Sequence, residues 1–597
     1  MSGFVIATAG HVDHGKSTLV RALTGIEPDR WAEERERGLT IDLGFAWTTL
    51  PSGRQVAFVD VPGHERYVGN MLAGLGPVPV VCFVIAADEG WQAQSSEHRD
   101  AIAALGITAG LIVITRRDRA PDAVPEVTAR ARAELRGTGL AAAPIVACSG
   151  VTGEGLDEVR GALDGVLAGL PEPDPHTRLR LWIDRAFTIA GSGTVVTGTL
   201  AGGTVRAGER LQLLGQETGG LREITVRGVQ SRGEPSEVLE PVSRAALNLR
   251  GIPAAEVHRG DALISADWWI TDTVDVRWAS GGAFDEGSEH ITVHIGTAAV
   301  GARLRPFDAD HARLQLSQPL PLQLGDRMVL RDSGAKMVVA GVQVLDLDPP
   351  TLTRRGAGRR RAEALAELPA GGSLAAEVAR RQAVEAETLT RFGLDVSRLP
   401  EGVVTVGRWL VDVDALRRWA QTLRTAVTAH QAVDALTPGM TRQAAVHALE
   451  LPHPDLLDAV VQVAKLNQRD GIISPPQPRA DLGRAEKGIQ ALERQLKATP
   501  FAAPEADDLS RLGLGARELA AAERVGRLIR IADGVVLLPS APAQAMRVLA
   551  GLGQPFTASQ ARQALGTTRR VAIPLLEHLD SRGWTRRLDG NLREVVR

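Results

Sequence analysis

The segment GHVDHGKST at residues 10–18 keeps a lysine in a chain that otherwise uses arginine for positive charge. Lys16 is the only lysine before Lys336, and its turn directly follows the strand-like run FVIATA. The pattern G-x-x-x-x-G-K-[ST] binds phosphates through backbone N–H groups at a helix N-terminus, and a compact ammonium suits such a loop better than a planar guanidinium. We therefore expect Lys16 to contact the β- and γ-phosphates and Ser17 to hold Mg²⁺. Nucleotide binding is assigned to Gly10, Asp13, His14, Gly15, Lys16, Ser17 and Thr18.

The segment DVPGHE at residues 60–65 follows another strand-like run, QVAFV. An acid at this position can hold Mg²⁺ through a water molecule, and a glycine N–H can sense a γ-phosphate. We therefore expect Asp60 to contact the metal through water and Gly63 to face the phosphate. His64 comes next and is the candidate catalytic residue, because it could orient the attacking water.

Thr40 lies in RGLTIDLGF, after the charged stretch WAEERERG. A segment of this kind can order around Mg²⁺ and a γ-phosphate, so Thr40 is the second expected hydroxyl ligand of the metal.

The strand-like run LIVIT ends in TRRD, and a later run ends in ACSG. The carboxylate of Asp118 can accept both N1–H and N2–H of guanine, a donor pair that adenine lacks. Thr115 and Arg116 belong to the same turn, and Ser149 and Gly150 supply backbone donors to the base. The order of these motifs after the phosphate loop favours GTP over ATP.

The elements that position these residues can be predicted from the pattern of apolar and turn residues, which changes along the chain. Buried runs alternate with helical stretches at first, which predicts an α/β domain with a parallel sheet. Glycine-punctuated strands then predict two β-barrels, and short helices followed by small β-wings predict tandem α+β winged-helix modules. The expected domains are 1–175 (nucleotide binding), 176–266 and 267–350 (barrels), and 351–420, 421–480, 481–540 and 541–597 (winged helices).

Composition limits the remaining choices. The chain has 597 residues and a net charge of -3, so any nucleic-acid contact must come from local basic patches. Cys82 and Cys148 are too few for a disulfide framework and lack metal-ligand spacing, which makes zinc unexpected. The longest apolar run, roughly residues 78–87, is shorter than the ~20 residues of a membrane span, so we expect a cytoplasmic protein without membrane contact.

With these motifs in place, the chain resembles the translational GTPases, and specifically the bacterial selenocysteine-specific elongation factors. The resemblance rests on GHVDHGKST, RGLTIDLGF, DVPGHERYVGNMLAG and AADEGWQAQSSEH, and extends to IDRAFTIAGSGTVVTGTL and GTTRRVAIPLLEHLDSRGWTRR. It implies a monomer that hydrolyses GTP to GDP on the ribosome with Mg²⁺, carries selenocysteinyl-tRNA, and binds an mRNA hairpin beside a UGA codon through its winged helices.

Two other classes share parts of this pattern. A GTP-gated transcription regulator would combine a phosphate loop with winged helices that bind DNA. The GTPase subunit of a nucleotide-metabolising enzyme would share the GTPase domain and barrels without needing winged helices.

The resemblance also nominates an aminoacyl pocket. A selenolate is ionised at neutral pH whereas a serine hydroxyl is not, so a selective pocket should present positive charge. Arg185 and Arg244 are the candidates by resemblance, with Asp42 to orient their guanidinium groups. The alternative is that these three residues form ordinary interdomain salt bridges.

The guanine-binding motifs depart from the family pattern at two positions. Arg116 replaces the lysine usual in the family's guanine motif, and Gly150 stands where alanine is usual.

Residues 541–597 hold nine arginines and no lysine against four acids, an excess of five positive charges. A helix N-terminus carrying arginines suits RNA phosphates, although the same side chains could be solvated surface charges. The expected RNA-binding residues are Arg569, Arg570, Arg586, Arg587 and Arg593.

Overall fold

The computed structural model describes residues 3–28, 40–216, 220–284, 288–332, 338–433, 439–476, 482–588 and 592–596. The charged stretch at 31–38, predicted to order around the nucleotide, lies outside the described residues. The chain divides into two compact units, Met1–Glu377 with Glu385–Leu399, and Val378–Val384 with Pro400–Arg597. None of the helices in the described ranges is both long and apolar enough to cross a membrane.

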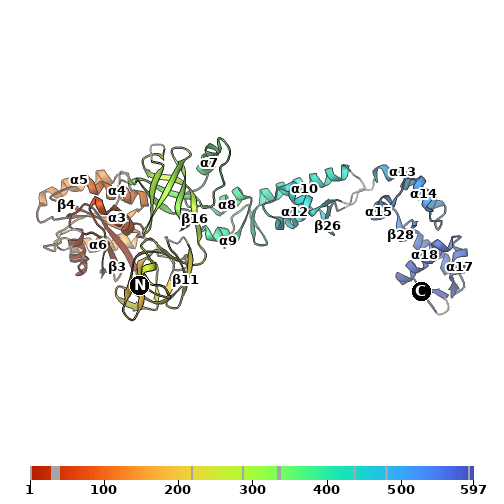
Figure 1. Cartoon of the computed structure of the whole chain (residues 1–597), viewed down its shortest axis with the longest axis horizontal. Coiled ribbons are helices and arrows are strands. Elements are labelled where there is room, and N and C mark those ends of the chain that lie inside the picture. Colours follow the sequence, from red (N-terminus) through yellow and green to blue (C-terminus); the bar gives the residue numbers. More distant parts are fainter. Residues whose placement is uncertain are drawn as a thin grey trace. The chain divides into compact units, whose positions relative to one another are not determined.

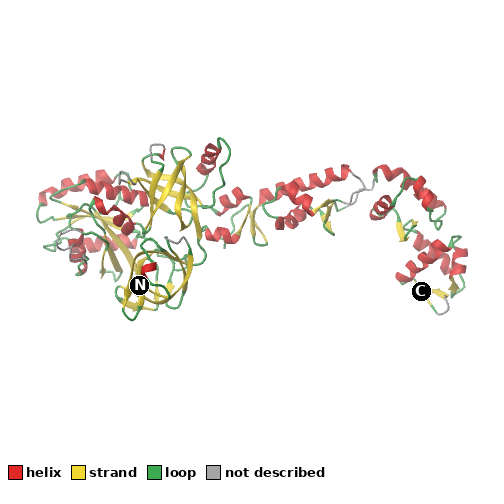
Figure 2. Ribbon diagram, viewed as in Figure 1, coloured by secondary structure: helices red, strands yellow, loops and turns green. Residues whose placement is uncertain are grey.

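The N-terminal domain is a six-stranded sheet with helices on both faces (Figures 1 and 2). Its order is β2-β3-β1-β4-β5-β6, in which only β2 and β3 pair antiparallel. β4 is buried along its whole length, as expected for a strand covered on both sides. The strands are β1 Gly3–Ala9, β2 Gly44–Thr49, β3 Gln55–Asp60, β4 Val80–Ala86, β5 Ala109–Thr115 and β6 Ile145–Ala147.

The helices of this domain pack in two groups. α1 and α6 contribute to the core on one face of the sheet, and α3, α4 and α5 contribute to the core on the other. Cys82 and Cys148 are buried free thiols in the first of these cores. The helices are α1 Lys16–Thr24, α3 Val68–Leu75, α4 Ala93–Leu105, α5 Val124–Leu135 and α6 Leu156–Ala168.

Two closed barrels follow. In the first, the ladder β10-β15-β7-β8-β14-β11 closes because β10 also pairs with β11. Its strands are β7 Arg180–Ile189, β8 Gly193–Leu200, β9 Val205–Arg206, β10 Arg210–Leu214, β11 Leu221–Ser231, β12 Glu234–Ser236, β13 Val238–Leu239, β14 Ser243–Arg250 and β15 Ala262–Ile264. The second closes in the order β16-β19-β18-β17-β20-β21, with strands β16 Trp269–Gly281, β17 His290–Ile295, β18 Ala298–Pro306, β19 His311–Leu322, β20 Arg327–Asp332 and β21 Val338–Asp346.

Glycines mark the close contacts between these three domains. A Cβ on Gly341 in β21 would lie 2.4 Å from the Cα of Ala104 in α4, so only glycine lets the helix reach the second barrel. A Cβ on Gly296 would lie 2.1 Å from the Trp182 ring, at the contact between the barrels. These contacts hold the nucleotide-binding domain and the barrels together in one compact unit.

The rest of the chain alternates short helices with small antiparallel sheets, which confirms the predicted multidomain fold class. The described sheets are β22-β24-β23, β25-β27-β26, β28-β29 and β30-β32-β31. Helices are α7 Ala357–Ala366, α8 Leu374–Arg381, α9 Ala386–Arg391, α10 Val413–Val433, α11 Arg442–Leu449, α12 Leu457–Val463, α13 Glu486–Ala498, α14 Ala506–Arg511, α15 Ala516–Arg524, α16 Ala541–Ala550, α17 Ala558–Ala564 and α18 Arg569–Ser581. Strands are β22 Ala383–Glu385, β23 Val403–Val406, β24 Trp409–Asp412, β25 Met440–Thr441, β26 Asn467–Arg469, β27 Ile472–Ser474, β28 Ile529–Ala532, β29 Val535–Leu537, β30 Phe556–Thr557, β31 Thr585–Arg587 and β32 Leu592–Val595.

One predicted domain limit needs correction. Helix α10 runs continuously from Val413 to Val433 and passes through the expected boundary at 420/421. Because the helix is a single element, we propose that the second winged-helix module begins at Val413. The other domain limits stay predictions.

The last two winged-helix modules share one hydrophobic core. It runs from Leu482 in the third module to Leu579 in the fourth and includes buried side chains of both. The hydroxyl of Thr567 also donates a hydrogen bond to the carbonyl of Phe501. Residues 482–596 therefore pack as one body, whereas the sequence suggested a separable module at 541–597.

Candidate functional site

A cavity of about 530 Å³ lies where the loops after β1, β5 and β6 meet. It contains most of the predicted nucleotide-binding residues, although they come from segments far apart in sequence. Its walls include Asp13, Gly15, Lys16, Ser17, Thr18, Gly63, Thr115, Arg116, Asp118, Ser149 and Gly150, together with Thr40.

The loop at residues 10–18 wraps the buried head of Lys16. Its Nζ donates to the carbonyl of Gly10 at 3.1 Å and to that of His11 at 2.8 Å. Gly15 has a φ of 81° and ends the loop where α1 begins, so the first N–H groups of the helix open toward the cavity. This arrangement of ammonium and helix N-terminus favours an anion.

Two of the predicted nucleotide-binding residues, Gly10 and His14, lie behind the phosphate loop. Gly10 is pressed against β4, since a Cβ there would lie 2.1 Å from the carbonyl oxygen of Val84. The ring of His14 is fully buried with Nδ1 3.4 Å from the same oxygen. Burial, reinforced by neighbouring His11, lowers the pKa of His14 to about 3 and keeps the ring neutral. The His14 side chain therefore supports the loop from behind. The assignment of His14 to nucleotide binding stays a prediction.

The expected metal ligands fit a Mg²⁺ ion. The hydroxyl oxygens of Ser17 and Thr40 lie 3.1 Å apart, close to the ~3.0 Å between adjacent ligands of an octahedral ion with bonds of about 2.1 Å. Asp60 is fully buried at the end of β3, where its Oδ1 accepts a hydrogen bond of 2.6 Å from Thr8. A fixed carboxylate in this position suits a metal-bound water.

Gly63 lines the phosphate side of the cavity, and His64 directly follows it in the chain but is not among the residues of the cavity wall. A Cβ on Gly63 would lie 2.4 Å from Nζ of Lys16 and 2.6 Å from the nitrogen of Val12, so only glycine fits against the loop. His64 caps the short helix Glu65–Tyr67, and its Nδ1 accepts the N–H of Arg66 at 3.2 Å. Nε2 is then the ring nitrogen that can face a water.

The opposite end of the cavity carries the guanine-binding candidates. Asp118 is exposed there, where its carboxylate can meet a base edge. The hydroxyl of Ser149 accepts the N–H groups of Val151 at 3.3 Å and Thr152 at 3.1 Å, which fixes the loop after β6. Thr115 donates to the carbonyl of His14 at 2.6 Å and ties this end to the phosphate loop.

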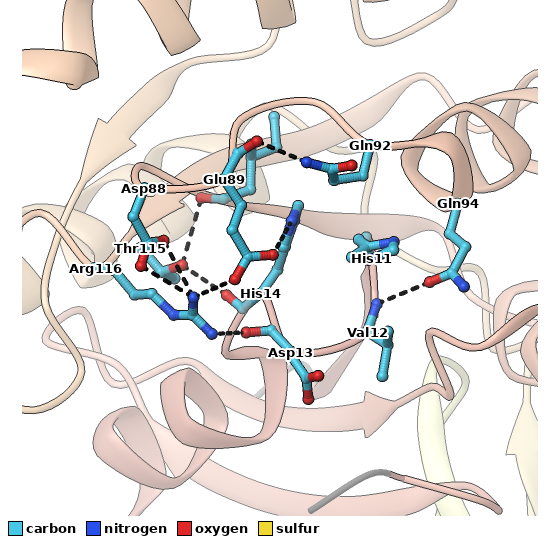
Figure 3. A network of polar contacts seen from close by, with 12 residues as sticks. His11, Val12, Asp13, His14, Asp88, Glu89, Gln92, Gln94, Thr115 and Arg116 are labelled. Atoms are coloured by element: carbon cyan, nitrogen blue, oxygen red, sulfur yellow. Dashed lines mark hydrogen bonds and ion pairs between the residues drawn. The ribbon is translucent and has the colours of Figure 1, made fainter. Parts of the chain in front are cut away.

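Figure 3 shows that the Arg116 guanidinium is turned toward the loop between β4 and α4. It bonds to the carboxylates of Asp88 and Glu89 and to the carbonyl of Asp13. Its charged end is therefore held by neighbouring residues of the chain, while Arg116 also lines the cavity.

The predicted aminoacyl residues do meet, at the contact between the first domain and the first barrel. Arg185 donates to Asp42 at 3.3 Å, and Arg244 pairs with both oxygens of Asp184. The ring of Phe45 joins the two arginines, with Arg244 3.9 Å and Arg185 5.4 Å from its centre. The two guanidinium groups thus flank one aromatic ring.

A third arginine was missed from the sequence. Arg259 lies 3.4 Å from Asp42 and donates to the side chain of Asn70 at 3.0 Å. Counted with Arg185, Arg244, Asp42 and Asp184, this cluster has one positive charge in excess. The segment HRGDAL carries no spacing signal that would have identified Arg259 from the sequence alone.

The five C-terminal arginines divide into two groups. Arg593 is 5% exposed and bonds to Asp580 at 2.9 Å, so it is a core residue, which corrects its predicted RNA contact. Arg570 donates to the backbone carbonyls of Gly534, Ala503 and Pro504, so its donors hold the third module.

Arg569, Arg586 and Arg587 are exposed, and Arg586 pairs with Glu594 across the β31–β32 hairpin. Trp584, 42% exposed, precedes the two wing arginines and was not singled out as a binding residue from the sequence. A large exposed aromatic beside basic residues is the signal that could have found it.

Comparison with known proteins gives three family matches. Residues 3–169 match the elongation factor Tu GTP-binding domain, residues 272–351 the β-barrel domain of selenocysteine-specific elongation factor, and residues 547–593 the winged helix of elongation factor SelB. Each match falls on the type of structure described above for that part of the chain.

Relatives match over the whole length. The selenocysteine-specific elongation factors of Escherichia coli (strain K12) and Desulfomicrobium baculatum are each 31% identical, covering 98% and 99% of this chain and 97% and 99% of their own. A crystal structure of a bacterial selenocysteine-specific elongation factor, EF-Sec, covers 100% of both chains at 25% identity with a TM-score of 0.69. Neither the transcription regulator nor the nucleotide-metabolising enzyme is favoured by these matches.

Proposed function

Because the chain belongs to the family of selenocysteine-specific elongation factors, we propose that it delivers selenocysteinyl-tRNA to the ribosome at UGA codons and is recruited by an mRNA hairpin. The observation that carries the proposal is the presence of a GTPase domain, two closed barrels and a winged-helix end in one chain. The winged helices give the chain a second nucleic-acid surface in addition to its tRNA-binding part. We place this activity in the cytoplasm, with the chain as a monomer.

The chain is a GTPase, and its nucleotide pocket takes GTP and GDP. Ser17 and Thr40 would hold Mg²⁺ directly and Asp60 through water, and the ion would neutralise charge on the β- and γ-phosphates. Lys16 contacts the same phosphates, and the N–H of Gly63 faces the γ-phosphate. His64 orients the attacking water once the ribosome has positioned it. Hydrolysis of GTP therefore determines when the tRNA is released.

The arginine cluster around Phe45 is proposed as the selenocysteine pocket. Its excess positive charge complements a selenolate and offers nothing comparable to a neutral serine hydroxyl. Asp42 and Asp184 hold the guanidinium groups of Arg185 and Arg244 in place before the aminoacyl group arrives.

The proposed hairpin-binding surface consists of Arg569, Arg586, Arg587 and Trp584. The arginines would contact phosphates, and the indole offers a face on which an unpaired base can stack. Because side chains cannot read the deep groove of A-form RNA, specificity should come from a bulged or looped base and from hairpin shape.

The experiment compares two charged forms of one tRNA. The chain with GTP should protect selenocysteinyl-tRNA from deacylation while leaving the same tRNA charged with serine unprotected. Replacing Arg185 and Arg244 with Ala should erase this difference, whereas replacing them with Lys should restore part of it by returning the charge.

A matched control changes two exposed arginines of the same barrel, Arg210 and Arg222, to Ala. This control should keep the parent's discrimination. Unchanged discrimination in the Arg185 and Arg244 double variant would reject the pocket, and equal protection of both tRNAs by the parent would reject the function.

A further inference from the structure

The backbone at Arg116 is unusual for a residue with a side chain. Its φ is 54°, in the left-handed region, directly after β5. The side chain leaves this turn toward the loop between β4 and α4, where Nη1 donates to both oxygens of Asp88 at 3.1 Å and to Glu89 (Figure 3).

The same guanidinium also forms a hydrogen bond to the phosphate loop. Its Nη2 donates to the carbonyl of Asp13, while the preceding residue, Thr115, donates to the carbonyl of His14 at 2.6 Å. The last residue of β5 and the residue that follows it thus hold two consecutive peptides of the loop that receives the phosphates. Arg116 therefore links both ends of the nucleotide cavity.

The loop that carries the two acids is itself rigid. The ring of Trp91 stacks on Phe83 with centres 5.3 Å apart and an interplanar angle of 6°, and its Nε1 donates to Ser96 at 3.0 Å. The side chain of Gln92 donates to the carbonyl of Glu89 at 2.7 Å. The carboxylates of Asp88 and Glu89 therefore lie on a well-packed loop, where they can hold the Arg116 guanidinium in place.

Arginine suits this geometry where lysine would not. A guanidinium presents donors in several directions, so one nitrogen can bond to the acids while another bonds to Asp13, whereas an ammonium is a single point of charge. Burial lowers the pKa of Arg116, but the hydrogen bonds that Arg116 donates to Glu89 and Asp88 outweigh it and raise the pKa above the usual arginine value. The acids therefore favour the charged guanidinium in this place.

We propose that Asp88, Glu89 and Arg116 form a charge clamp that positions the phosphate loop and slows release of the bound nucleotide. The three are positioning residues, since they act through the carbonyl of Asp13. The side chains of Arg116, Asp88 and Glu89 are 22%, 26% and 36% exposed, so dissolved salt can screen the clamp. The inference rests on the assignment of this cavity to GTP and GDP.

The test measures the dissociation rate of a fluorescent GDP analogue from the full chain at low and high salt. The double variant Asp88→Asn with Glu89→Gln should release the analogue about tenfold faster at low salt, the factor expected from losing a charge-assisted contact. Salt should accelerate release from the parent and leave the double variant almost unaffected.

Glu154→Gln is the matched control, because Glu154 pairs at 3.2 Å with Arg117 in the same turn but outside the clamp. Its release rate and salt response should match those of the parent within about twofold. A double variant with the parent's rate at low salt, or with the parent's salt response, would overturn the clamp. A parent chain that binds no GDP would instead reject the nucleotide assignment.

Arg116→Lys gives a second, independent measurement. In the parent background it should speed release, because the ammonium cannot bond to the acids and the loop together. In the Asp88 and Glu89 double variant the same change should add little, since the partners are already gone. Fully additive effects of the two changes would contradict the clamp even if every variant folds normally.

Discussion

Lys16 lines the nucleotide cavity and His64 directly follows Gly63, a residue of the cavity wall, but their substitutions should have different effects. Lys16 is buried and bonded within the phosphate loop, so Lys16→Ala should abolish nucleotide binding. His64 caps its own short helix and has no bond to the phosphate loop among the described contacts, so His64→Ala should bind nucleotide almost normally and lose hydrolysis on the ribosome. Equilibrium binding and ribosome-stimulated GTP turnover separate the two steps.

Arg130→Ala serves as a control for His64→Ala, because Arg130 lies on an exposed part of helix α5 and should leave turnover per bound nucleotide near the parent's. Ribosome-stimulated turnover at the parent's rate in His64→Ala would remove His64 from the mechanism.

Acid should destabilise the nucleotide-binding domain through His98. This ring is 2% exposed, and its Nδ1 accepts the N–H of Gly10 at 3.1 Å. Burial, and then the charge of Lys16, lowers the pKa of His98 from its usual 6.5 to about 3. Between these values the unfolded chain binds a proton that the native chain does not, so the free energy of unfolding falls by about 1.4 kcal/mol per pH unit below 6.5.

His98→Asn keeps an acceptor but cannot titrate. Denaturant unfolding at pH 7.5 and 5.5 should therefore show a loss of stability smaller by about 1 kcal/mol in this variant. Exposed His176→Asn should behave as the parent, and an equal acid loss in His98→Asn and the parent would refute the assignment.

The predicted residues that line the cavity are those whose motif fixes the backbone as well as the side chain. The glycines around Lys16 and Gly63 dictate the loop, so these residues reach the cavity together. An arginine's position in the sequence says nothing of its partner, and for that reason Arg593 was wrongly given an RNA contact instead of its bond to Asp580. Arg116 shows the same limit, since only the fold brings Asp88 within reach.

At the scale of elements, helix α7 is held to the second barrel by a buried arginine. Arg361 is 6% exposed and bonds to Asp275 at 2.6 Å and to Asp346, both fully buried. Arg361→Ala should reduce the free energy of unfolding by about 3 to 5 kcal/mol, because it leaves buried carboxylates without this cation. Arg359→Ala, on an exposed part of the same helix, should change it by less than about 0.5 kcal/mol in the same denaturant titration.

A loss of less than about 1 kcal/mol in Arg361→Ala would show that α7 is held mainly by apolar contacts, such as those of Leu365 with Leu345.

Element types were predictable where periodicity and turn residues agree. The buried runs became β4 and β5, and the glycine-punctuated region became two closed barrels. The limit at 420/421 failed because no glycine or proline interrupts VDALRRWAQTLRTAVTAH, so nothing ends the helix there. Barrel closure depends on pairing between distant strands, such as β10 with β15, and is invisible in local patterns.

At the scale of the whole molecule, the shared core at the C-terminal end has consequences for folding. A fragment of residues 541–597 would expose Leu575 and Leu576, which pack in a core that extends into the third module. We expect this fragment to unfold at much lower denaturant than residues 482–597, which contain that whole core. Circular dichroism of both fragments during a urea titration makes the comparison.

Equal unfolding midpoints for the two fragments would mean that the fourth module folds alone. The junction between the two modules would then be a docking contact and not part of a common core.

Hairpin binding should distinguish arginines that contact RNA from arginines that hold the protein together. Arg569 is exposed at the N-terminus of α18, so Arg569→Ala should lower the slope of log affinity against log salt by about 1, as expected for one lost phosphate contact. Arg570→Ala removes bonds to Gly534 and Ala503 in the third module. It should weaken binding equally at every salt concentration and keep the slope, because it disturbs the junction and not a phosphate contact.

Filter binding of the full chain to its hairpin across a salt series measures both quantities. Trp584→Ala should weaken binding to the hairpin but not to a regular duplex, because stacking needs an unpaired base. An Arg570→Ala slope reduced as much as that of Arg569→Ala would place Arg570 on the RNA after all. The bonds to Gly534 and Ala503 would then be exchanged for phosphate on binding, and the junction would open when the hairpin is bound.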